Sequence, residues 1–415
     1  MFSVNAKYWI SLSQALGYNN PKIKEIAKLY PDVSDFFRGG EREWRLCGFL
    51  NARDIEKLNS RSKDIADRIL ERCSELGYSV ISIDDESYPE CLFNIYAPPA
   101  VLYVDGNLPD ADNRFTIGIV GTRRASRYGT ENSYKIAYSL SKYGTTIISG
   151  GALGVDCASH RGTLAANGVT VCVRGCGINS NYLPANAEMR KAIAVRGAVI
   201  SEYPPDEEPR SYYFPARNRI IAALSDGLLL IEAGSKSGSL ITANLALDMG
   251  KEIFALLGNN SPQNEGSNKR IKEGTAVPVT DFMDILAEFD NLRLDCREIN
   301  SDDISLADIA AIPVKGMKRT SIDSVADERK HDEEPKRASA IKRKNSTSVV
   351  SKTKLNITLR GESKKVYDYL GDEPVHIDKL AGDLHMPVQQ ALSTLTFLEM
   401  NGLVRVLQGR YFVLD

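Results

Sequence analysis

The strongest constraint on the fold is a regular alternation of short apolar runs and helical patterns between Phe115 and Gly258. Each run is apolar at consecutive positions, so both of its faces must be covered, which is typical of strands inside a parallel sheet. We expect strands at 116–120, 145–149, 169–173, 198–202, 227–231 and 252–257. We expect helices near 129–143, 155–167, 185–196, 215–224 and 239–249. This order predicts an α/β fold with an extended, Rossmann-like, doubly wound sheet.

Three of the predicted strands lead into turns of small residues that stand directly before a helix. The first turn begins at Gly121, the second is Gly150-Gly151, and the third is Ser237-Gly238-Ser239. Glycine lets backbone N–H groups approach a ligand, and the start of a helix favours negative charge. Because the carboxyl ends of parallel strands share one edge of a sheet, we expect the three turns to form one phosphate-binding face.

Arginine side chains accompany these turns. Arg123, Arg124 and Arg127 follow the first glycine, with Ser126 among them, and guanidinium groups at a helix start make a good phosphate clamp. A second set, Arg217-Asn218-Arg219, precedes apolar helical residues. We expect that these two arginines do not both face the core. One should point to a ligand, and the other should pair with Glu232 or another acid.

Two further polar residues follow the second turn. Asp156 is placed to cap the next helix, and His160 lies within that helix without a matching nucleophile or base, so we interpret it as structural. The sequence carries no P-loop lysine motif and no recognisable metal-ligand cluster. We therefore expect a binding protein and no enzyme, with no metal and no cofactor.

Net charge, cysteine content and the lack of long apolar segments exclude some classes of protein. The net charge is −2, so any electrostatic binding must come from local patches. Seven cysteines, without a CxxC pair, suggest free thiols in a reducing compartment, and we expect the closest pair, Cys172 and Cys176, to be buried thiols rather than ligands. We find no signal peptide and no apolar segment of membrane-spanning length. We therefore expect a cytoplasmic protein without a membrane partner.

A chain of 415 residues needs more than one core, and we divide it into four parts. Residues 1–76 read as a small helical domain, similar to SAM or helix-hairpin-helix modules, either a DNA binder or an interaction module. Residues 77–290 hold the main sheet, which strands within 77–110 should extend at its edge. Residues 291–356 read as a disordered basic linker, a spacer or a non-specific DNA contact.

Residues 357–415 show three helical patterns followed by a β-hairpin, the order of a winged-helix domain. The third pattern, 387–400, is poor in lysine and arginine. That composition fits protein contact or weak DNA contact better than specific readout of a duplex.

Several motifs together resemble the DprA/Smf family of DNA-processing proteins. They are Gly121–Gly129, Ser149–Asp156, Phe214–Ile221, Glu232-Ala233 with Ser237–Ala243, and the late Gly266-Ser267-Asn268 with Gly274. The resemblance implies an extended Rossmann domain that binds single-stranded DNA. It also implies a homodimer that helps load the RecA recombinase onto incoming DNA during natural transformation, without catalysis.

The resemblance also suggests roles for particular residues. Arg123 corresponds to the arginine of the family's DNA pocket, with the first and second turns beside it. The stretch Leu183–Asn186 is similar to a family turn of tyrosine, proline and asparagine, but Leu183 replaces the tyrosine, and Ala185 stands where some members carry a DNA-contacting lysine. Arg190 or Lys191 could compensate for that lysine. Another departure is Leu256-Leu257-Gly258 in place of Val-Pro-Gly.

The predicted nucleic-acid-binding residues combine the three turns with the polar set before the later helix. They are Gly121, Arg123, Arg124, Ser126, Arg127, Gly150, Gly151, Asn186, Arg217, Asn218, Arg219, Ser237, Gly238 and Ser239. Which of Tyr128, Tyr182 or Phe214 stacks on a base depends on the fold.

Two alternatives use the same kind of fold. One is a nucleotide phosphoribohydrolase, but that class carries a Pro-Gly-Gly-x-Gly-Thr loop, and the corresponding region here, Glu232–Gly238, lacks it. The other is a sensor that binds a small nucleotide without turnover.

Overall fold

The computed structural model describes residues 2–60 and 64–289. In the C-terminal part it describes 362–371, 375–384, 404–407 and 411–414, together with Met386, Ala391, Thr394, Leu395 and Leu398. The chain divides into two compact units, Met1–His331 and Asp332–Asp415. Over the described ranges, none of the helices combines the length and the apolar character needed to cross a membrane.

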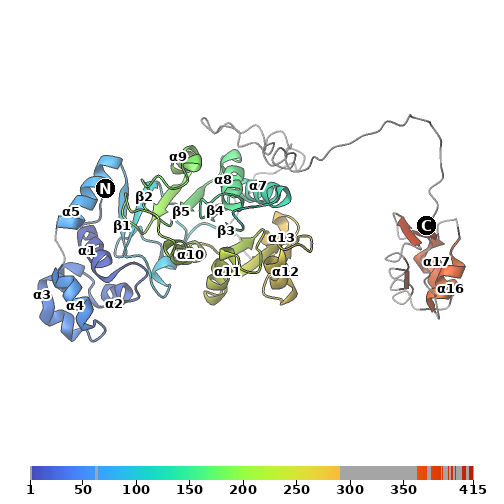
Figure 1. The fold of residues 1–415 in the computed structure, drawn as a ribbon, viewed down its shortest axis with the longest axis horizontal. Coiled ribbons are helices and arrows are strands. Elements are labelled where there is room, and N and C mark those ends of the chain that lie inside the picture. The colour runs from blue at the N-terminus through green and yellow to red at the C-terminus, as the bar shows by residue number, and fades with distance from the viewer. Residues whose placement is uncertain are drawn as a thin grey trace, which may run out of the picture. The chain divides into compact units, whose positions relative to one another are not determined.

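One large sheet forms the centre of the first unit (Figure 1). In the part of this unit that the structure describes, the strand order is β1-β2-β6-β5-β4-β3-β7-β8-β9. The strands are β1 (Ser79–Ser82), β2 (Val101–Gly106), β3 (Thr116–Val120), β4 (Thr146–Ser149), β5 (Thr170–Val173), β6 (Ala198–Ser201), β7 (Gly227–Leu230), β8 (Glu252–Leu256) and β9 (Val277–Val279). Neighbours from β6 to β9 pair in parallel, and β1 and β2 pair antiparallel at the edge. The predicted doubly wound sheet and its edge extension are confirmed.

The central strands of this sheet are buried on both faces, as their continuous apolar runs predict. Every residue of β3, β4, β5, β6 and β7 is buried. The edge strand β9 was not predicted. It is short and contains Pro278, a residue that only an edge strand tolerates well.

Helices cover both faces of the sheet. In Figure 1, α7 (Arg127–Lys142), α8 (Val155–Ala165) and α9 (Ala187–Arg196) lie above the sheet, and α10 (Tyr213–Ala223), α11 (Gly238–Asp248) and α12 (Glu265–Lys272) lie below it. The short elements are α6 (Glu90–Phe93), the 3-10 turn η1 (Pro184–Asn186) and α13 (Phe282–Leu286). The helices α7 to α11 match the five predicted ones, with shifts of a few residues at their ends.

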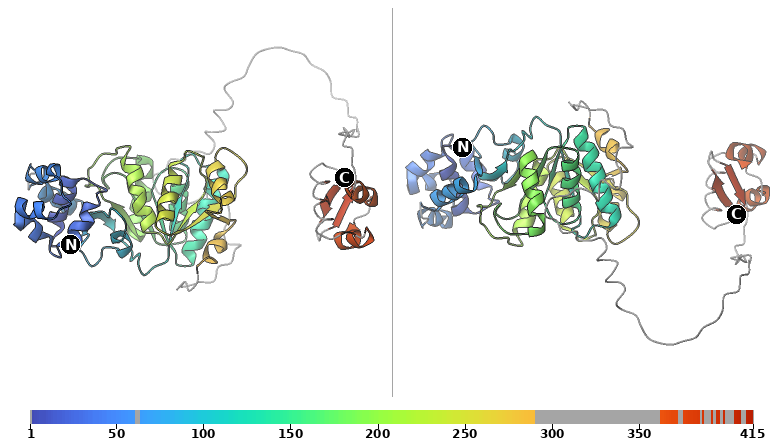
Figure 2. Two further views of the ribbon diagram at one scale, coloured as in Figure 1. Left: turned by 90° about the horizontal axis from the view of Figure 1, so that it is seen from below. Right: turned by 90° about the horizontal axis from the view of Figure 1, so that it is seen from above.

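The N-terminal helices stand at the β1–β2 end of the sheet (Figure 2). They are α1 (Ala6–Leu16), α2 (Lys22–Leu29), α3 (Val33–Leu46), α4 (Ala52–Ser60) and α5 (Asp64–Leu76). α1 contacts the other helices as well as β1 and β2, and one buried cluster runs from Trp9 through Tyr103 to Ile200. Residues 61–63, between α4 and α5, lie outside the described residues.

The C-terminal unit has its own core. It contains α16 (Glu362–Tyr369), β10 (Val375–His376), α17 (Ile377–Asp383), β11 (Val404–Leu407) and β12 (Tyr411–Leu414), with the sheet order β10-β12-β11. Val366, Leu380, Leu395 and Phe412 are buried together. The predicted first two helices and the hairpin are present. Most of the predicted third helix, and all of the predicted linker at 291–356, lie outside the described residues.

Candidate nucleic-acid interface

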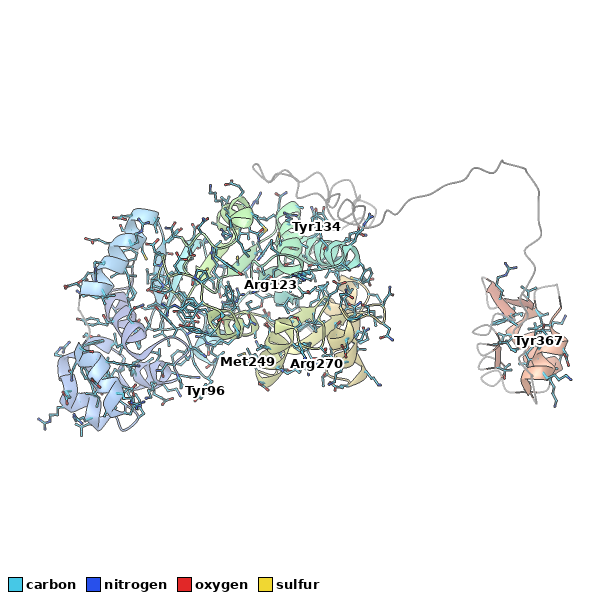
Figure 3. The ribbon with its side chains drawn as sticks, in the orientation of Figure 1. Tyr96, Arg123, Tyr134, Met249, Arg270 and Tyr367 are labelled. Carbon is cyan, nitrogen blue, oxygen red and sulfur yellow. The ribbon has the colours of Figure 1, made fainter. Side chains whose placement is uncertain are left out.

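The order of the strands reverses at β3, which lies between β4 and β7. Open α/β sheets bind ligands beyond the carboxyl ends of the strands at such a point. A cavity of about 460 Å³ opens there. Its lining includes Gly121, Thr122, Arg123, Ala152, Asp156, Arg217, Asn218, Ser237, Gly238 and Ser239. The first and third turns line this cavity, and the second turn reaches it through Ala152, so the three turns meet on one face as predicted. In Figure 3, Arg123 lies between the helices above the sheet and those below it.

The first turn is shaped by Glu232, which is almost fully buried at the end of β7. Its carboxylate accepts hydrogen bonds from the backbone N–H of Ser126 (2.8 Å) and from the Ser126 hydroxyl (2.5 Å). The same hydroxyl oxygen caps α7 by accepting from the N–H of Gly129 at 3.0 Å. Ser126 therefore positions the turn, and Glu232 pairs with this turn rather than with an arginine.

The three arginines of the first turn differ in their surroundings. The Arg123 guanidinium lies over the ring of Phe214, 5.4 Å from its centroid, and it lines the cavity. A ring face of this kind stabilises a cation while leaving its N–H groups available. Arg127 forms an exposed ion pair with Glu131 at 2.6 Å, and Arg124 is exposed. Of the three, Arg123 is the one that faces the cavity.

The second turn needs its two glycines because there is no room for side chains. A Cβ atom on Gly151, which has φ +68°, would lie 2.5 Å from the Sγ of Cys172, and one on Gly150 would lie 2.8 Å from the Arg217 guanidinium. The carbonyl of Gly151 accepts a hydrogen bond from Asn186 at 3.2 Å. Asn186 is completely buried, so it supports the turn from behind and is not placed to touch a ligand directly, contrary to our expectation.

Asp156 does not cap α8, so that prediction is wrong. The cap position belongs to Gly154, whose φ of +78° turns the chain so that the helix begins at Val155. Asp156 accepts instead from the backbone N–H of Ala152 at 3.2 Å. Burial raises the pKa of its carboxyl above the usual value, and the nearby Arg217 charge opposes that shift. The carboxyl thus lies within the cavity wall, close to a cation.

His160 is structural, as predicted. Its ring is fully buried, and its Nδ1 atom hydrogen-bonds with the Thr170 hydroxyl at 2.8 Å. Burial lowers the pKa of His160 to about 3, so the ring is neutral at physiological pH.

Arg217 and Arg219 are both buried, so the prediction that only one could face the interior is wrong. Residues two apart on a helix point in nearly opposite directions, and each guanidinium here enters its own polar pocket. Arg219 forms a bidentate pair with Glu202 (2.6 and 2.7 Å) and donates to the carbonyl of Ala97 at 2.8 Å. It faces away from the 460 Å³ cavity, so we remove it from the candidate interface.

Arg217 lies at the floor of the cavity. Its guanidinium donates to the carbonyl oxygens of Gly150 (3.0 Å) and Val173, and to the side-chain oxygen of Asn218 at 3.3 Å. This arrangement joins the second turn, β5 and α10, and it places Asn218 on the cavity wall.

The third turn presents the start of α11. The Ser237 hydroxyl caps the helix by accepting from the N–H of Ser239, and the two hydroxyl oxygens are 2.7 Å apart. Gly238 has open space around its Cα. Helix-start N–H groups and hydroxyls suit an anion here.

A second, smaller cavity of about 20 Å³ lies behind the second turn. It shares Arg123, Ala152, Phe214 and Arg217 with the larger cavity and adds Cys172, Arg174, Cys176, Tyr182, Leu183 and Arg190. Sequence reasoning missed Arg174. It stands directly after β5 and before Gly175. The other turns were found by looking for small residues at the ends of predicted strands, and the same search would have found Arg174.

The sequence left open which aromatic ring and which additional cation lie at the cavities, and the structure shows both. Phe214 lines both cavities, and the ring of Tyr182 packs against it with a centroid distance of 5.1 Å. Tyr128 instead donates its hydroxyl to the carbonyl of Leu257. Arg190 lines the small cavity, whereas Lys191 forms an exposed pair with Glu188.

Cys172 and Cys176 are buried free thiols, as predicted. Across the described parts of the chain, no group of three or more histidine, cysteine, aspartate or glutamate residues could hold a metal ion.

The fold and the cavities define a Rossmann-like α/β protein with a cationic crevice at its switch point and an appended C-terminal unit. A family model described as DNA recombination-mediator protein A matches residues 79–290, and a DprA winged helix domain matches residues 351–410. The chain belongs to the DprA/Smf family.

Individual relatives agree with this assignment. The chain is 36% identical over 264 residues to Protein Smf of Synechocystis sp., covering 61% of this chain and 65% of that protein. It is 38% identical over 208 residues to DNA processing protein DprA of Bacillus subtilis, covering 50% of this chain and 70% of that protein. The crystal structure of DprA from Streptococcus pneumoniae matches with a TM-score of 0.59 and 31% identity, over 70% of this chain and 100% of that one.

Proposed function

We propose that the crevice beyond β3 and β7 binds single-stranded DNA without catalysis, and that the protein is a recombination mediator. One observation carries the proposal. The Arg123 guanidinium is held over the Phe214 ring, and both line a cavity that the start of α11 also lines. A cation and helix-start N–H groups suit phosphates, and an aromatic face suits a base.

The shape of the site favours a single strand over a duplex. The cavity is concave, and Phe214 lies inside its wall rather than on an open surface. A base reaches such a ring only when it is free of its stack, and a single strand meets that condition without the cost of opening a duplex.

The enzyme alternative is less well supported by the site. The Glu232 carboxylate is engaged with Ser126 and packs beside Gly129, so it does not face the cavity as a free base. Release of a free base from nucleoside monophosphates would establish the hydrolase alternative. Tight binding of a small nucleotide without turnover would favour the sensor.

Family membership supports finer proposals about partners. We propose that the protein works as a homodimer in the cytoplasm and loads the RecA recombinase onto incoming single strands during natural transformation. Light scattering would give twice the 45.7 kDa subunit mass for the dimer. Faster RecA assembly on single-stranded DNA in the presence of the protein would support loading.

We further propose the four-part organisation into 1–76, 77–290, 291–356 and 357–415, with the basic third part as a linker. Limited proteolysis tests it. Cleavage concentrated between residues 291 and 356 would support the linker, and protection of that range would contradict it.

The DNA site is tested by fluorescence anisotropy with labelled single- and double-stranded oligonucleotides at several salt concentrations. We expect preferential binding of the single strand, which weakens as salt rises because phosphate contacts release counterions. Arg123→Glu should reduce the affinity for the single strand by about 10- to 100-fold, since a charge-assisted contact becomes a repulsion.

Arg127→Glu is the matched control. It makes the same change of net charge four residues further along, but its side chain is paired with Glu131 and does not line the cavity. We expect Arg127→Glu to change the affinity for the single strand by about threefold or less, because this surface charge is already paired. Equal losses in both variants, or equal binding of both kinds of DNA, would contradict the proposed site.

A further inference from the structure

An open groove lies between the last turn of α11 and the loop that follows α6. It consists of two adjoining hollows of about 710 and 240 Å³, which share Ile95, Tyr96, Leu245 and Met249 as lining residues. We call it the Tyr96 groove, and Figure 3 shows Tyr96 and Met249 close together below the sheet. The DNA crevice is lined by the first residues of α11, a helix of 11 residues. The two sites therefore lie at opposite ends of a helix that is about 16 Å long.

The loop that carries Tyr96 is fixed on both sides of that residue. The Lys24 ammonium group donates to the two carbonyl oxygens that precede Tyr96 in the chain, at 2.9 and 3.0 Å. The Arg219 guanidinium donates to the carbonyl oxygen of Ala97, which follows it, at 2.8 Å. Both chain neighbours of Tyr96 are buried, yet the Tyr96 side chain itself is 82% exposed. The backbone thus holds this ring out toward solvent.

A fixed loop that presents a tyrosine to solvent is typical of a protein-binding surface. Tyrosine offers a large apolar area with few rotatable bonds, so little conformational freedom is lost when a partner covers it. Leu245 and Met249 stand four residues apart on α11, on the same side of the helix, and both are half-buried in the groove. They extend the apolar floor beside the ring, and the floor therefore suits an apolar side chain of a partner.

The rim of the groove is acidic. Glu90, Asp112 and Asp248 line the larger hollow and are exposed, and the basic residue among its lining residues is Lys251. Asp112 also accepts from the backbone N–H groups of Glu90 (2.6 Å) and Cys91 (3.0 Å) at the start of α6. Within the described ranges, none of the three carboxylates forms an ion pair. Asp248 is also the last residue of α11, where the helix dipole disfavours a negative charge. A cation beside Asp248 would be stabilised by the carboxylate and by the helix end.

These charges distinguish between the possible occupants of the groove. The phosphates of a nucleic acid would be repelled by the three carboxylates. A two-fold contact with a second copy of the chain would place the same acidic rim against itself. A polypeptide segment that combines lysine or arginine with an apolar side chain meets both the rim and the floor.

We propose that the Tyr96 groove docks a basic segment of a partner protein. An apolar side chain of that segment packs on Tyr96 and Met249, and a neighbouring lysine or arginine pairs with Asp248. Because the groove and the crevice lie at opposite ends of α11, the partner and single-stranded DNA are bound at the same time. The inference does not depend on what the crevice binds.

The test selects short random peptides, displayed on phage, on the immobilised full chain. The enriched sequences are then synthesised with a fluorescent label and titrated by anisotropy. We expect them to combine an apolar residue with lysine or arginine. Asp248→Lys and Tyr96→Ser should each weaken their binding by about tenfold or more. Asp248→Lys should fold normally, because it places a favourable charge at the end of α11.

Val195→Ser and Glu71→Lys are the matched controls. Val195, on α9, is also 82% exposed, and Glu71 is an exposed acid of α5, and neither residue lines the groove. Both variants should bind the peptides within about twofold of the unchanged chain. Binding of single-stranded DNA should be the same in all four variants.

Enrichment of no peptide, or of acidic peptides, would overturn the inference. Peptide binding that survives Tyr96→Ser would overturn it as well, because the peptides would then occupy another surface. Light scattering of the two groove variants covers a second copy of the chain: a fall in mass would show that a copy, and not a partner, occupies the groove. An about tenfold loss of DNA affinity in these variants would assign the groove to DNA instead.

Discussion

Arg217 and Arg219 show how much two neighbouring arginines can differ. Both are buried, but Arg217 is compensated by carbonyl oxygens at the edge of a cavity and Arg219 by the Glu202 carboxylate away from it. A buried ion pair contributes little net stability compared with apolar residues, yet removing one partner leaves an uncompensated charge. Arg219 therefore contributes to the stability of the fold, whereas Arg217 forms part of the cavity lining.

Replacing Arg219 by methionine should therefore destabilise the fold by about 3–5 kcal/mol, because the Glu202 carboxylate stays buried without its partner. Urea denaturation at pH 7 measures the loss. The double variant Arg219→Met/Glu202→Gln removes the stranded charge and should recover part of the stability. A loss of DNA affinity with unchanged stability would instead place Arg219 at the interface.

At the scale of elements, the turns are built by the packing of strands and helices around them. The second turn is confined by β5 at Cys172, by α8 at Asp156 and by Arg217 from α10. Asn186, at the junction of η1 and α9, supports it from behind. The glycines of this turn are needed both for backbone conformation and for space.

Gly151→Ala should destabilise the protein by about 2–4 kcal/mol, since a positive φ and an overpacked Cβ both oppose it. Gly250→Ala is the control. Gly250 has a similar φ of +71°, with no atom within 4 Å of an added Cβ. It should cost only about 1 kcal/mol, from the backbone alone.

Thermal or chemical unfolding compares the two glycine variants. Adding Cys172→Ala to the Gly151→Ala chain should restore part of the stability, because the contact of the new Cβ with the sulfur disappears. Equal losses at the two glycines would mean that the contact with Cys172 does not matter.

At the scale of the whole molecule, both cavities lie within the first unit, between residues 120 and 242. The N-terminal helices share a continuous core with the sheet, whereas the C-terminal unit has a core of its own. The crevice should therefore work without the C-terminal unit and without the basic segment before it.

A chain ending at Phe289 should bind single-stranded DNA within about threefold of the affinity of the full chain. The slope of log affinity against log salt should also be unchanged, since each phosphate contact contributes about −0.7 to it on single strands. Anisotropy titrations over a salt series measure both. A shallower slope would show that the basic segment or the C-terminal unit contacts DNA.

The sequence alone determined the α/β class, the strands from β3 to β8, the three turns and the family. These features depend on local patterns: apolar runs, helical spacing and small residues at strand ends, all of which are visible along the chain. Arg123, two residues after the first glycine, was also among the predicted site residues, and the family resemblance singled it out. The short strands β9 and β10 escaped because two or three residues carry too little pattern.

Only the tertiary structure decided the partners of the polar side chains. Arg219 pairs with Glu202 rather than with Glu232, and Asn186 bonds to the back of a turn. The ring of Phe214 supports Arg123. Each of these contacts joins elements that are far apart in sequence. The same holds for the four arginines around the small cavity. Arg123 lies in the first turn and Arg174 follows β5, whereas Arg190 lies on α9 and Arg217 on α10. Charge and hydrogen-bonding capacity are properties of a residue, but burial and partnership arise only when the sheet brings distant segments together.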